Sequence, residues 1–226
     1  MKYQYILFDA DETLFSFDNF AGIKRLMARY DTPFTQDDFD IYQKYNKALW
    51  LRYQQHEIDA EHLQVERFVA LAKQVGVSPQ QLNDEFLDTM VEICEPLPGA
   101  IDLLNVLKGK ATLGIITNGL ARMQHKRIEH TGLEGRFACL VISEEFGVPK
   151  PNVAIFEHAF DILGNPDKSK ILMVGDTLSS DIVGGQNAGI DTCWLQHPNV
   201  PLFDDIQPTY HITHLHQLQT LLLNAE

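Results

Sequence analysis

Short apolar runs that alternate with amphipathic stretches constrain the fold of this chain more than any other feature of its sequence. Four runs have the composition of buried parallel strands and end in polar residues or glycine, at residues 5–8, 112–117, 138–143 and 170–176. Two weaker runs lie at 192–196 and 210–213. Helical patterns separate them, at 98–109, 122–132, 152–164 and 180–189. This alternation predicts an α/β fold with a doubly wound parallel sheet.

One connection in this pattern is much longer than the others. Residues 15–95 carry almost no strand signal, only amphipathic helical stretches such as 37–58 and 78–94. A crossover between parallel strands needs only a dozen or so residues. We therefore expect a helical domain inserted after the first strand, with residues 1–14 and 96–226 as the α/β core. Because the insert leaves from the carboxyl end of that strand, we expect it to form a lid over this edge of the sheet.

The charge balance limits the partners of the chain. Its 226 residues include 31 Asp and Glu against 18 Lys and Arg, a formal net charge of −13. Such a surface repels polyphosphate backbones and anionic lipids, so we expect neither a nucleic-acid polymer nor a membrane as a partner. A small anionic substrate remains compatible, because a bound metal and one or two basic groups reverse the charge locally. The sequence leaves open whether the protein is a monomer or a homodimer.

The cysteines and the N-terminal segment indicate the compartment. Cys94, Cys139 and Cys193 are widely spaced and form no CxxC pair, so we expect buried, reduced thiols in a cytoplasmic protein. The N-terminal apolar run is interrupted by "DADE" too early for a signal peptide. No apolar segment has the length of a membrane span.

Polar side chains gather at the expected carboxyl ends of the strands. The first strand is followed by Asp9 and Asp11, and the second runs into "TNG" at 117–119. Lys150 comes after the third strand, and the fourth leads into "GDTLSSD" at 175–181. Each motif alone has an ordinary interpretation as a turn, a helix cap or a surface lysine. Their occurrence in order at successive strand ends predicts one crevice that combines carboxylates, a cation, and hydroxyl and amide donors.

These motifs resemble those of haloacid dehalogenase (HAD) superfamily phosphatases that carry a helical cap after the first strand. The matching segments are "DADET" at 9–13, "TNG", Lys150 and "GDTLSSD". "FDADETLF", "NKALW", "PLPGA" and "VISEEFGVPKPN" are also similar to segments of bacterial pyrimidine 5′-nucleotidases. The resemblance implies a HAD-like core and a Mg²⁺-dependent phosphomonoesterase. It also implies small substrates, pyrimidine nucleoside monophosphates such as dUMP, UMP and dTMP.

The resemblance implies a role for each of four carboxylates. Asp9 would attack phosphorus and form an aspartyl-phosphate. Asp11 would protonate the leaving alkoxide and then take a proton from the water that cleaves the acyl phosphate. Mg²⁺, with Mn²⁺ or Co²⁺ as substitutes, would be held by Asp9, the backbone carbonyl of Asp11, Asp176 and Asp181. A cation and a phosphate between these groups would explain why the chain places so many acids together.

Donors for the phosphate come from the same motifs. By resemblance, the Thr117 hydroxyl and the backbone N–H groups of Asn118 and Gly119 would hold the phosphoryl oxygens, and Thr13 belongs to the same set. Lys150 would neutralise charge that the metal does not reach.

The residue after Asp11 departs from the commonest form of the family, which has glycine where this chain has Glu12. We therefore expect Glu12 to be a solvated turn residue whose backbone needs no positive φ. Acidic residues also occur there in some branches of the family, so the catalytic assignment is unaffected.

The insert is rich in aromatic residues, with 12 of the 22 in the chain. They could stack on a nucleobase or build the core of a small helical domain, and both interpretations stay open. Phe15 and Phe17 are candidate substrate contacts because they lie just beyond the first motif, near the hinge of the insert. By resemblance more than by pattern, Asn46, Lys47 and Trp50 are the other candidates. Asn46 and Trp50 are four residues apart and share a helix face.

Other activities fit parts of this pattern. A HAD sugar-phosphate phosphatase or phosphomutase shares the core motifs and is the main alternative. A 2-haloacid dehalogenase needs neither the acid at Asp11 nor a metal, and a phosphonatase needs a Schiff-base lysine in the cap. A receiver-type signalling domain would be much shorter, and a non-catalytic binding protein on this fold would not need the intact motif set. We expect His211, His214 and His216 to be exposed rather than metal-binding, because no carboxylate or cysteine joins them.

Overall fold

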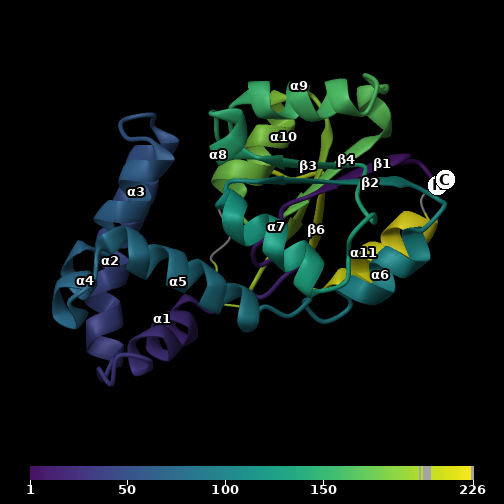
Figure 1. Ribbon diagram of the computed structural model, residues 1–226. Coiled ribbons are helices and arrows are strands. Elements are labelled where there is room, and N and C mark those ends of the chain that lie inside the picture. The colour runs from purple at the N-terminus through teal and green to yellow at the C-terminus, as the bar shows by residue number, and fades with distance from the viewer. Residues whose placement is uncertain (199, 201–204, 225–226) are drawn as a thin grey trace. The chain divides into compact units, whose positions relative to one another are not determined.

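The computed structural model of the chain describes residues 1–198, 200 and 205–224, which form two compact units (Figure 1). The first unit consists of Met1–Ser16, Glu95–Gln124 and Thr131–Glu226. The second consists of Phe17–Cys94 and His125–His130. Among the described residues, no helix has both the length and the apolar character needed to cross a membrane.

The first unit is built on a six-stranded parallel sheet with the strand order β3-β2-β1-β4-β5-β6. The strands are β1 (Tyr5–Phe8), β2 (Thr112–Thr117), β3 (Cys139–Ile142), β4 (Ile171–Gly175), β5 (Asp191–Leu195) and β6 (Tyr210–Ile212). All six lie where the apolar runs predict them, because continuous apolar runs are typical of strands that are covered on both faces.

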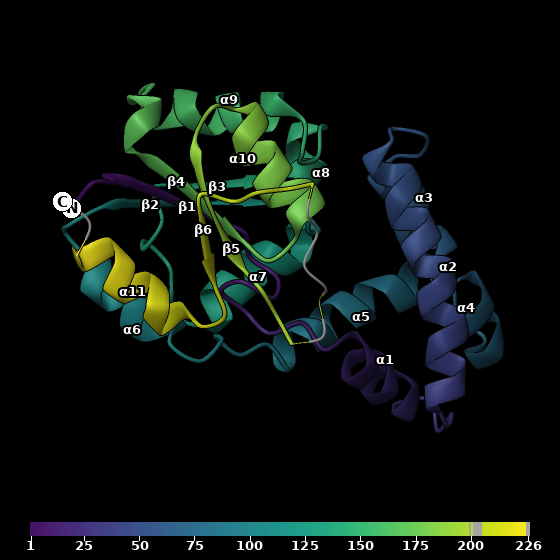
Figure 2. The same cartoon turned by 180° about the vertical axis from the view of Figure 1, so that it is seen from behind.

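Helices cover both faces of the sheet (Figures 1 and 2). Helices α9 (Val153–Ile162) and α10 (Val183–Asn187) lie side by side on one face, and α6 (Ala100–Leu107) and α11 (Leu215–Asn224) pack together on the other. The remaining elements are α7 (Ala121–His130), α8 (Ser143–Phe146), the 3₁₀ turn η1 (Lys168–Lys170) and the π-helical turn η2 (Leu178–Ile182). This arrangement confirms the predicted α/β fold with a doubly wound parallel sheet.

A buried apolar cluster joins the sheet to α9. It includes Leu7 of β1, Ile116 of β2, Met173 of β4 and the rings of Phe156 and Phe160. Burying a side chain of this size stabilises a fold by about 1.5–3 kcal/mol. The strands that lead into the polar loops are therefore stabilised by apolar packing on this face.

The strand order reverses at β1, which lies between β2 and β4. In sheets of this kind, ligands bind outside the carboxyl ends of the strands at the point of reversal. Asp9 directly follows β1, Thr117 ends β2, and Asp176 directly follows β4. The topology thus brings three motifs that are distant in sequence to one edge of the sheet.

The two segments that connect the first unit to the second are themselves paired. The backbone N–H of Leu97 donates to the carbonyl of Leu14 at 2.8 Å, and the N–H of Ser16 donates to the carbonyl of Glu95 at 2.8 Å. The Ser16 hydroxyl accepts from the N–H of Glu95 at 3.1 Å. The chain therefore leaves and re-enters the first unit through a short antiparallel pair.

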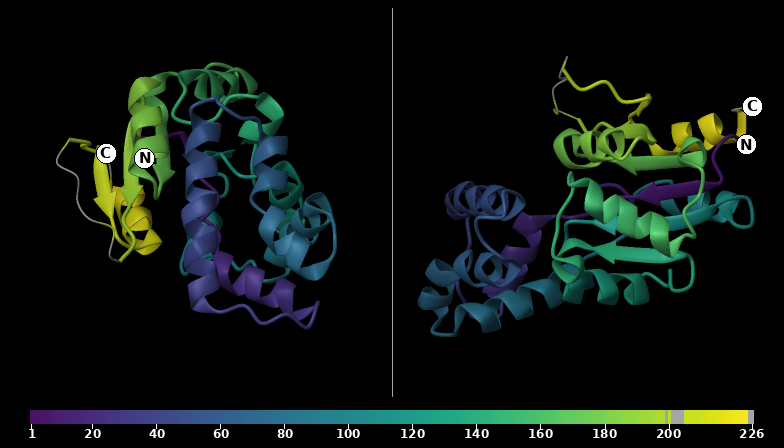
Figure 3. Two further views of the ribbon diagram at one scale, coloured as in Figure 1. Left: turned by 90° about the vertical axis from the view of Figure 1, so that its left-hand side faces the viewer. Right: turned by 90° about the horizontal axis from the view of Figure 1, so that it is seen from above.

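The second unit is helical (Figure 3). Its helices are α1 (Asn19–Ala28), α2 (Gln36–Gln54), α3 (Ala60–Glu66), α4 (Val69–Val75) and α5 (Pro79–Glu92), and α5 packs against α1, α3 and α4. Six rings contact one another in sequence through its interior, with centroids 5.2–6.4 Å apart: Phe34, Phe20, Phe39, Tyr42, Phe68 and Phe86. Half of the aromatic residues of the insert thus take part in its own packing.

The three cysteines are buried and form no disulfide, as predicted for reduced thiols. Burial raises the pKa of the Cys139 thiol to about 11 and that of the Cys193 thiol to about 12. At neutral pH these groups are therefore protonated and poorly nucleophilic, which agrees with a packing role.

Candidate active site

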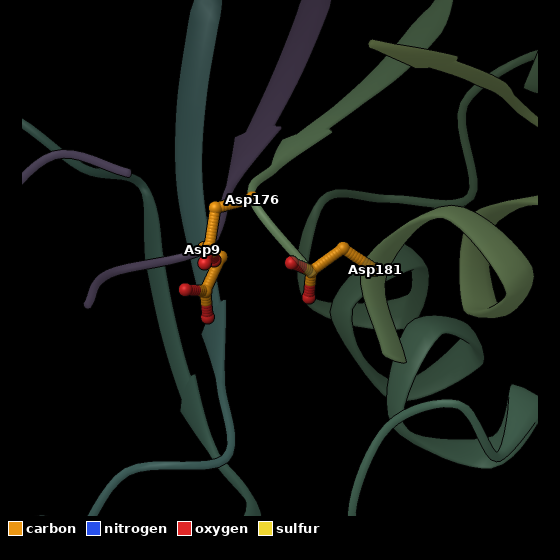
Figure 4. A group of neighbouring side chains, drawn as sticks. All are labelled: Asp9, Asp176 and Asp181. Carbon is orange, nitrogen blue, oxygen red and sulfur yellow. The ribbon is translucent and has the colours of Figure 1, made fainter. Parts of the chain in front are cut away.

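Three carboxylates converge at the point where the strand order reverses, and Figure 4 shows them directed toward a common space. Asp9 follows β1, Asp176 follows β4, and Asp181 lies in η2. One ligand oxygen from each lies within 4.8 Å of those of the other two. The structure thus brings together three residues that the sequence nominates as metal ligands.

Lys150 lies within this group and is almost fully buried. Its ammonium is 2.6 Å from Asp9 Oδ1 and 2.7 Å from Asp181 Oδ1. It also donates to the carbonyl oxygen of Ile116 in β2 at 2.7 Å. The three donor positions of the ammonium are therefore matched by three acceptors, which holds the charge in place.

The buried charges perturb one another. Burial raises the pKa of the Asp9 carboxyl to about 7; Lys150 opposes this shift, whereas Asp181 and Asp11 add to it. Burial, followed by the charges of Asp181 and Asp9, raises the pKa of Asp176 to about 9. Burial lowers the pKa of the Lys150 ammonium, but Asp181 and Asp9 outweigh it and raise that pKa above its ordinary value. One lysine thus neutralises less negative charge than this part of the protein holds.

This donor set fits a divalent cation of the Mg²⁺ type. Carboxylate oxygens are the hard ligands that Mg²⁺ prefers, and the raised pKa values of Asp9 and Asp176 show that added positive charge would be favourable here. Asp181 is held in position by the backbone N–H of Thr177, which donates to its Oδ2 at 2.9 Å. A Cβ atom on Gly175 would lie 2.2 Å from that same oxygen, so glycine is required beside it.

The "TNG" residues organise the loop that carries Lys150. The Asn118 side-chain amide donates to the backbone carbonyl of Lys150 at 3.0 Å, and its oxygen accepts from the backbone N–H of Lys150 at 2.8 Å. The backbone N–H of Gly119 donates to Thr117 Oγ1 at 3.0 Å. Asn118 therefore ties the second motif to the third, a role that its nomination as a backbone donor did not include.

The carboxylate of Asp11 accepts a hydrogen bond that sequence reasoning missed. Gln124 Nε2 donates to Asp11 Oδ2 at 3.1 Å, and the Gln124 side chain is buried on α7. In the sequence Gln124 is one polar residue of an amphipathic helix and carries no motif. The one sequence feature that could have indicated its role is its position in the first turn of the helix that follows "TNG".

The backbone after Asp11 differs from the prediction. Glu12 has φ = 54°, in the left-handed region, so the expectation that it would need no positive φ is wrong. Its N–H donates to the carbonyl of Phe15 at 2.7 Å, and its own carbonyl lies 2.5 Å from His197 Nε2. These contacts impose the turn on a residue that disfavours it by about 1–2 kcal/mol. Thr13 follows, fully buried, and its hydroxyl has no hydrogen-bond partner among the described residues.

Trp194 is a second residue that sequence reasoning missed. It lies on β5 opposite Gly175 of β4, and its indole N–H donates to the backbone carbonyl of Asp176 at 2.7 Å. Its ring stacks on His211 with a centroid separation of 4.9 Å. His211, His214 and His216 are all exposed, as predicted, and the structure groups none of them with other metal ligands among its described residues.

The side chains predicted to contact the substrate differ in how exposed they are to solvent. Phe15 is fully buried in the first unit, and Phe17 is half-buried at the start of the second. On α2, Lys47 is exposed, and Trp50 packs edge-on against Tyr53 with centroids 5.8 Å apart. Asn46 is buried on the same helix, and its Oδ1 has no hydrogen-bond partner among the described residues.

Residues 3–189 match the family model of haloacid dehalogenase-like hydrolases, and the chain belongs to this family. It is 50% identical to pyrimidine 5′-nucleotidase YjjG of Escherichia coli (strain K12), over 98% of this chain and 99% of that protein. It is 32% identical to pyrimidine 5′-nucleotidase PynA of Streptococcus pneumoniae, over 94% of this chain and 92% of that protein. The structure is also similar to the magnesium-bound crystal structure of the HAD-hydrolase YfnB from Bacillus subtilis, in which interdomain movement was found. The alignment covers 100% of each chain, with a TM-score of 0.86 and 31% sequence identity.

Proposed function

We propose that this protein is a Mg²⁺-dependent phosphomonoesterase that hydrolyses pyrimidine nucleoside 5′-monophosphates. The observation that carries the proposal is the buried contact of Lys150 with both Asp9 and Asp181, beside Asp176. This arrangement places one anionic oxygen nucleophile next to fixed positive charge, which is what attack on a phosphate dianion requires.

In the first step Asp9 is the nucleophile. An oxygen of its carboxylate forms a bond to phosphorus while the bond from phosphorus to the ester oxygen breaks. The carboxyl of Asp11 gives its proton to the leaving alkoxide, so the nucleoside departs as a neutral alcohol. Asp9 then carries the phosphoryl group as an acyl phosphate.

In the second step the roles of the two residues reverse. The carboxylate of Asp11 takes a proton from a water molecule, and the water oxygen bonds to phosphorus. The bond between phosphorus and Asp9 breaks, which releases inorganic phosphate and restores the Asp9 carboxylate. Lys150 neutralises charge on the phosphoryl oxygens, and the hydroxyls of Thr13 and Thr117 with the N–H groups of Asn118 and Gly119 orient them.

Asp9, Asp176 and Asp181, together with the Asp11 carbonyl, would hold the metal. A bound Mg²⁺ would supply positive charge that offsets the repulsion between the Asp9 carboxylate and the phosphate. We infer that Mn²⁺ and Co²⁺ support the same reaction, because both accept oxygen ligands in similar geometry.

The substrate class rests on the relatives. Two proteins named as pyrimidine 5′-nucleotidases align with nearly the whole chain, one of them at 50% identity. We infer that residues 15–95 close over the phosphate site and that Phe17, Asn46, Lys47 and Trp50 contact the nucleoside, with Phe15 supporting the hinge. We further infer that the protein works in the cytoplasm.

The test is phosphate release from a panel of nucleoside monophosphates and sugar phosphates, measured with Mg²⁺, Mn²⁺, Co²⁺ or EDTA. We expect metal-dependent turnover of dUMP, UMP and dTMP that exceeds turnover of sugar phosphates. Asp9→Asn should abolish it, and Asp102→Asn, which changes an exposed acid of α6, should not.

Two outcomes would overturn parts of the proposal. Faster turnover of sugar phosphates would retain the mechanism and reject the nucleotide assignment. Halide release from 2-haloacids in EDTA, with no metal-dependent phosphate release, would replace the mechanism with that of a dehalogenase.

A further inference from the structure

We propose that Gln124 is a positioning residue that holds the Asp11 carboxyl for proton transfer and determines which of its oxygens carries the proton. The inference rests on the proposed function of Asp11 as general acid and base. It concerns a residue of α7 that belongs to none of the four motifs.

The contact is close and enclosed. Gln124 Nε2 donates to Asp11 Oδ2 at 3.1 Å, across 113 positions of sequence. Gln124 is 1% exposed, so water does not compete strongly for this donor. A Gln side chain has three rotatable bonds, and its burial here removes most of that freedom. Asp11 thus meets a donor that is already oriented.

Gly119 makes this contact possible. A Cβ atom on Gly119 would lie 2.0 Å from Gln124 Nε2 and 3.1 Å from Asp11 Oδ2. Any side chain at position 119 would therefore occupy the path by which the amide of Gln124 reaches Asp11. The glycine of "TNG" has a steric purpose in addition to its backbone N–H.

The contact assigns different tasks to the two oxygens of Asp11. An amide N–H can only donate, so the oxygen that faces it must accept in both protonation states. Oδ2 is that oxygen, and because a carbonyl oxygen accepts more strongly than a hydroxyl oxygen, the contact favours the carboxyl form in which Oδ1 carries and delivers the proton. A carboxyl fixed in this way presents its proton in one direction, whereas a freely rotating one does so only part of the time.

The environment of the amide oxygen of Gln124 indicates that the contact with Asp11 contributes to activity more than to stability. Gln124 Oε1 is buried and has no hydrogen-bond partner among the described residues. A buried acceptor without a partner is destabilising, and an apolar side chain of similar size would avoid this cost. Polar groups retained at a cost to stability are characteristic of active sites.

The experiment compares wild type with Gln124→Leu on two substrates, dUMP and p-nitrophenyl phosphate. The alkoxide of dUMP must be protonated as it leaves, whereas p-nitrophenolate is stable enough to leave without a proton. The parameter kcat/KM covers the steps up to alcohol release, so it isolates the transfer from Asp11. Met123→Leu, a buried change at the neighbouring position of α7, is the matched control. Gln124→Glu is the second variant, because it keeps the size and removes the donor when ionised.

We expect both Gln124 variants to lose about 10- to 100-fold in kcat/KM for dUMP, a part of the 10²- to 10⁴-fold that general acid catalysis contributes. For p-nitrophenyl phosphate the loss should stay within about threefold, and the Tm of Gln124→Leu should equal or exceed that of wild type. Equal losses on both substrates, or no loss on either, would overturn the inference. Failure of wild type to hydrolyse either substrate would overturn the proposed function and this inference with it.

Discussion

The Lys150 ammonium donates to the Asp9 carboxylate at 2.6 Å, although 141 positions separate the two residues in the sequence. Both side chains are buried, so neither charge is stabilised by bulk water. Breaking a buried ion pair by removing one partner typically costs 3–5 kcal/mol, because the remaining charge is left without compensation.

Lys150→Met should therefore reduce both activity and stability. We expect phosphatase activity to fall at least about 100-fold and the free energy of unfolding in EDTA to fall by about 3–5 kcal/mol. Added Mg²⁺ should raise the Tm of this variant more than that of wild type, since the cation replaces the lost charge. Chemical denaturation and thermal scans measure both effects. Lys168→Met, which removes an exposed partner of Glu157, should change stability by less than about 1 kcal/mol; an equal loss there would refute the buried-pair argument.

Stability without metal should fall as pH rises. Asp9 and Asp176 have folded-state pKa values raised to about 7 and about 9, above the ordinary value of 3.8. A raised pKa means that the folded protein holds the proton more tightly than the unfolded chain, so the stabilisation is complete below pH 3.8 and is lost as pH rises through 7 and 9. In EDTA we expect Tm to decrease from pH 5 to pH 9, and saturating Mg²⁺ should reduce this decrease. Asp176→Asn should flatten the EDTA profile, and an unchanged slope in this variant would contradict the assignment.

The effects of substitutions at Gly119 and Gln124 on kcat should depend on each other. Gly119→Ala alone should displace the Gln124 amide and reduce kcat for dUMP by about 10-fold or more. In the Gln124→Ala background the two closest atoms, Gln124 Nε2 and Cδ, are absent and only Asp11 Oδ2 remains, at 3.1 Å from the new Cβ, so the same change should cost clearly less. A double-mutant cycle of kcat measures this coupling. Additive effects of the two substitutions would mean that Gly119 acts only through its backbone.

Gly175→Ala should weaken metal binding through Asp181. The new Cβ would lie 2.2–2.4 Å from Asp181 Oδ2, Cβ and Cγ, so the carboxylate must move. Overpacking of this kind costs about 1–3 kcal/mol of stability. Titration calorimetry with Mg²⁺ should show a loss of affinity similar to that of Asp181→Asn. Retention of wild-type affinity would show that Asp181 does not contribute to the metal site.

Asn46→Ala should affect nucleotides selectively. Asn46 Oδ1 has no hydrogen-bond partner in the part of the chain that the structure describes. If it accepts a hydrogen bond from a pyrimidine edge, losing this bond should raise KM for dUMP by about 10-fold, equivalent to about 1.4 kcal/mol. KM for p-nitrophenyl phosphate, which has no such edge, should stay the same. Lys44→Ala, an exposed change on the same helix, is the control. An equal rise in KM for both substrates would show that Asn46 does not recognise the pyrimidine base.

The sheet and its polar strand ends could be predicted from sequence for physical reasons. Strands covered on both faces need unbroken apolar residues, so Ile171–Gly175 and its neighbours stand out from the helices around them. Parallel strands place their carboxyl ends at one edge, so motifs at Asp9, Lys150 and Asp181 had to converge.

The predictions failed where a property depends on the packing of one element against another. Gln124 and Asp11 lie 113 positions apart, so their contact depends on tertiary packing that no local pattern encodes. Glu12 adopts a positive φ because Phe15 and His197 hold its backbone, and His197 lies 185 positions away. Trp194 contacts Asp176 through the register of two adjacent strands.

The paired segments around Ser16 and Glu95 have an evolutionary consequence. Because the chain departs and returns at adjacent points that are hydrogen-bonded to each other, the sheet unit needs only a short turn between them to be continuous. Residues 17–94, which form the second unit together with His125–His130 of α7, can therefore vary in length without a break in the unit that holds Asp9, Lys150 and Asp176. Changes in this one long insertion, matched by changes in the second half of α7, offer a route by which related chains could diversify while the carboxylates at the strand ends stay the same.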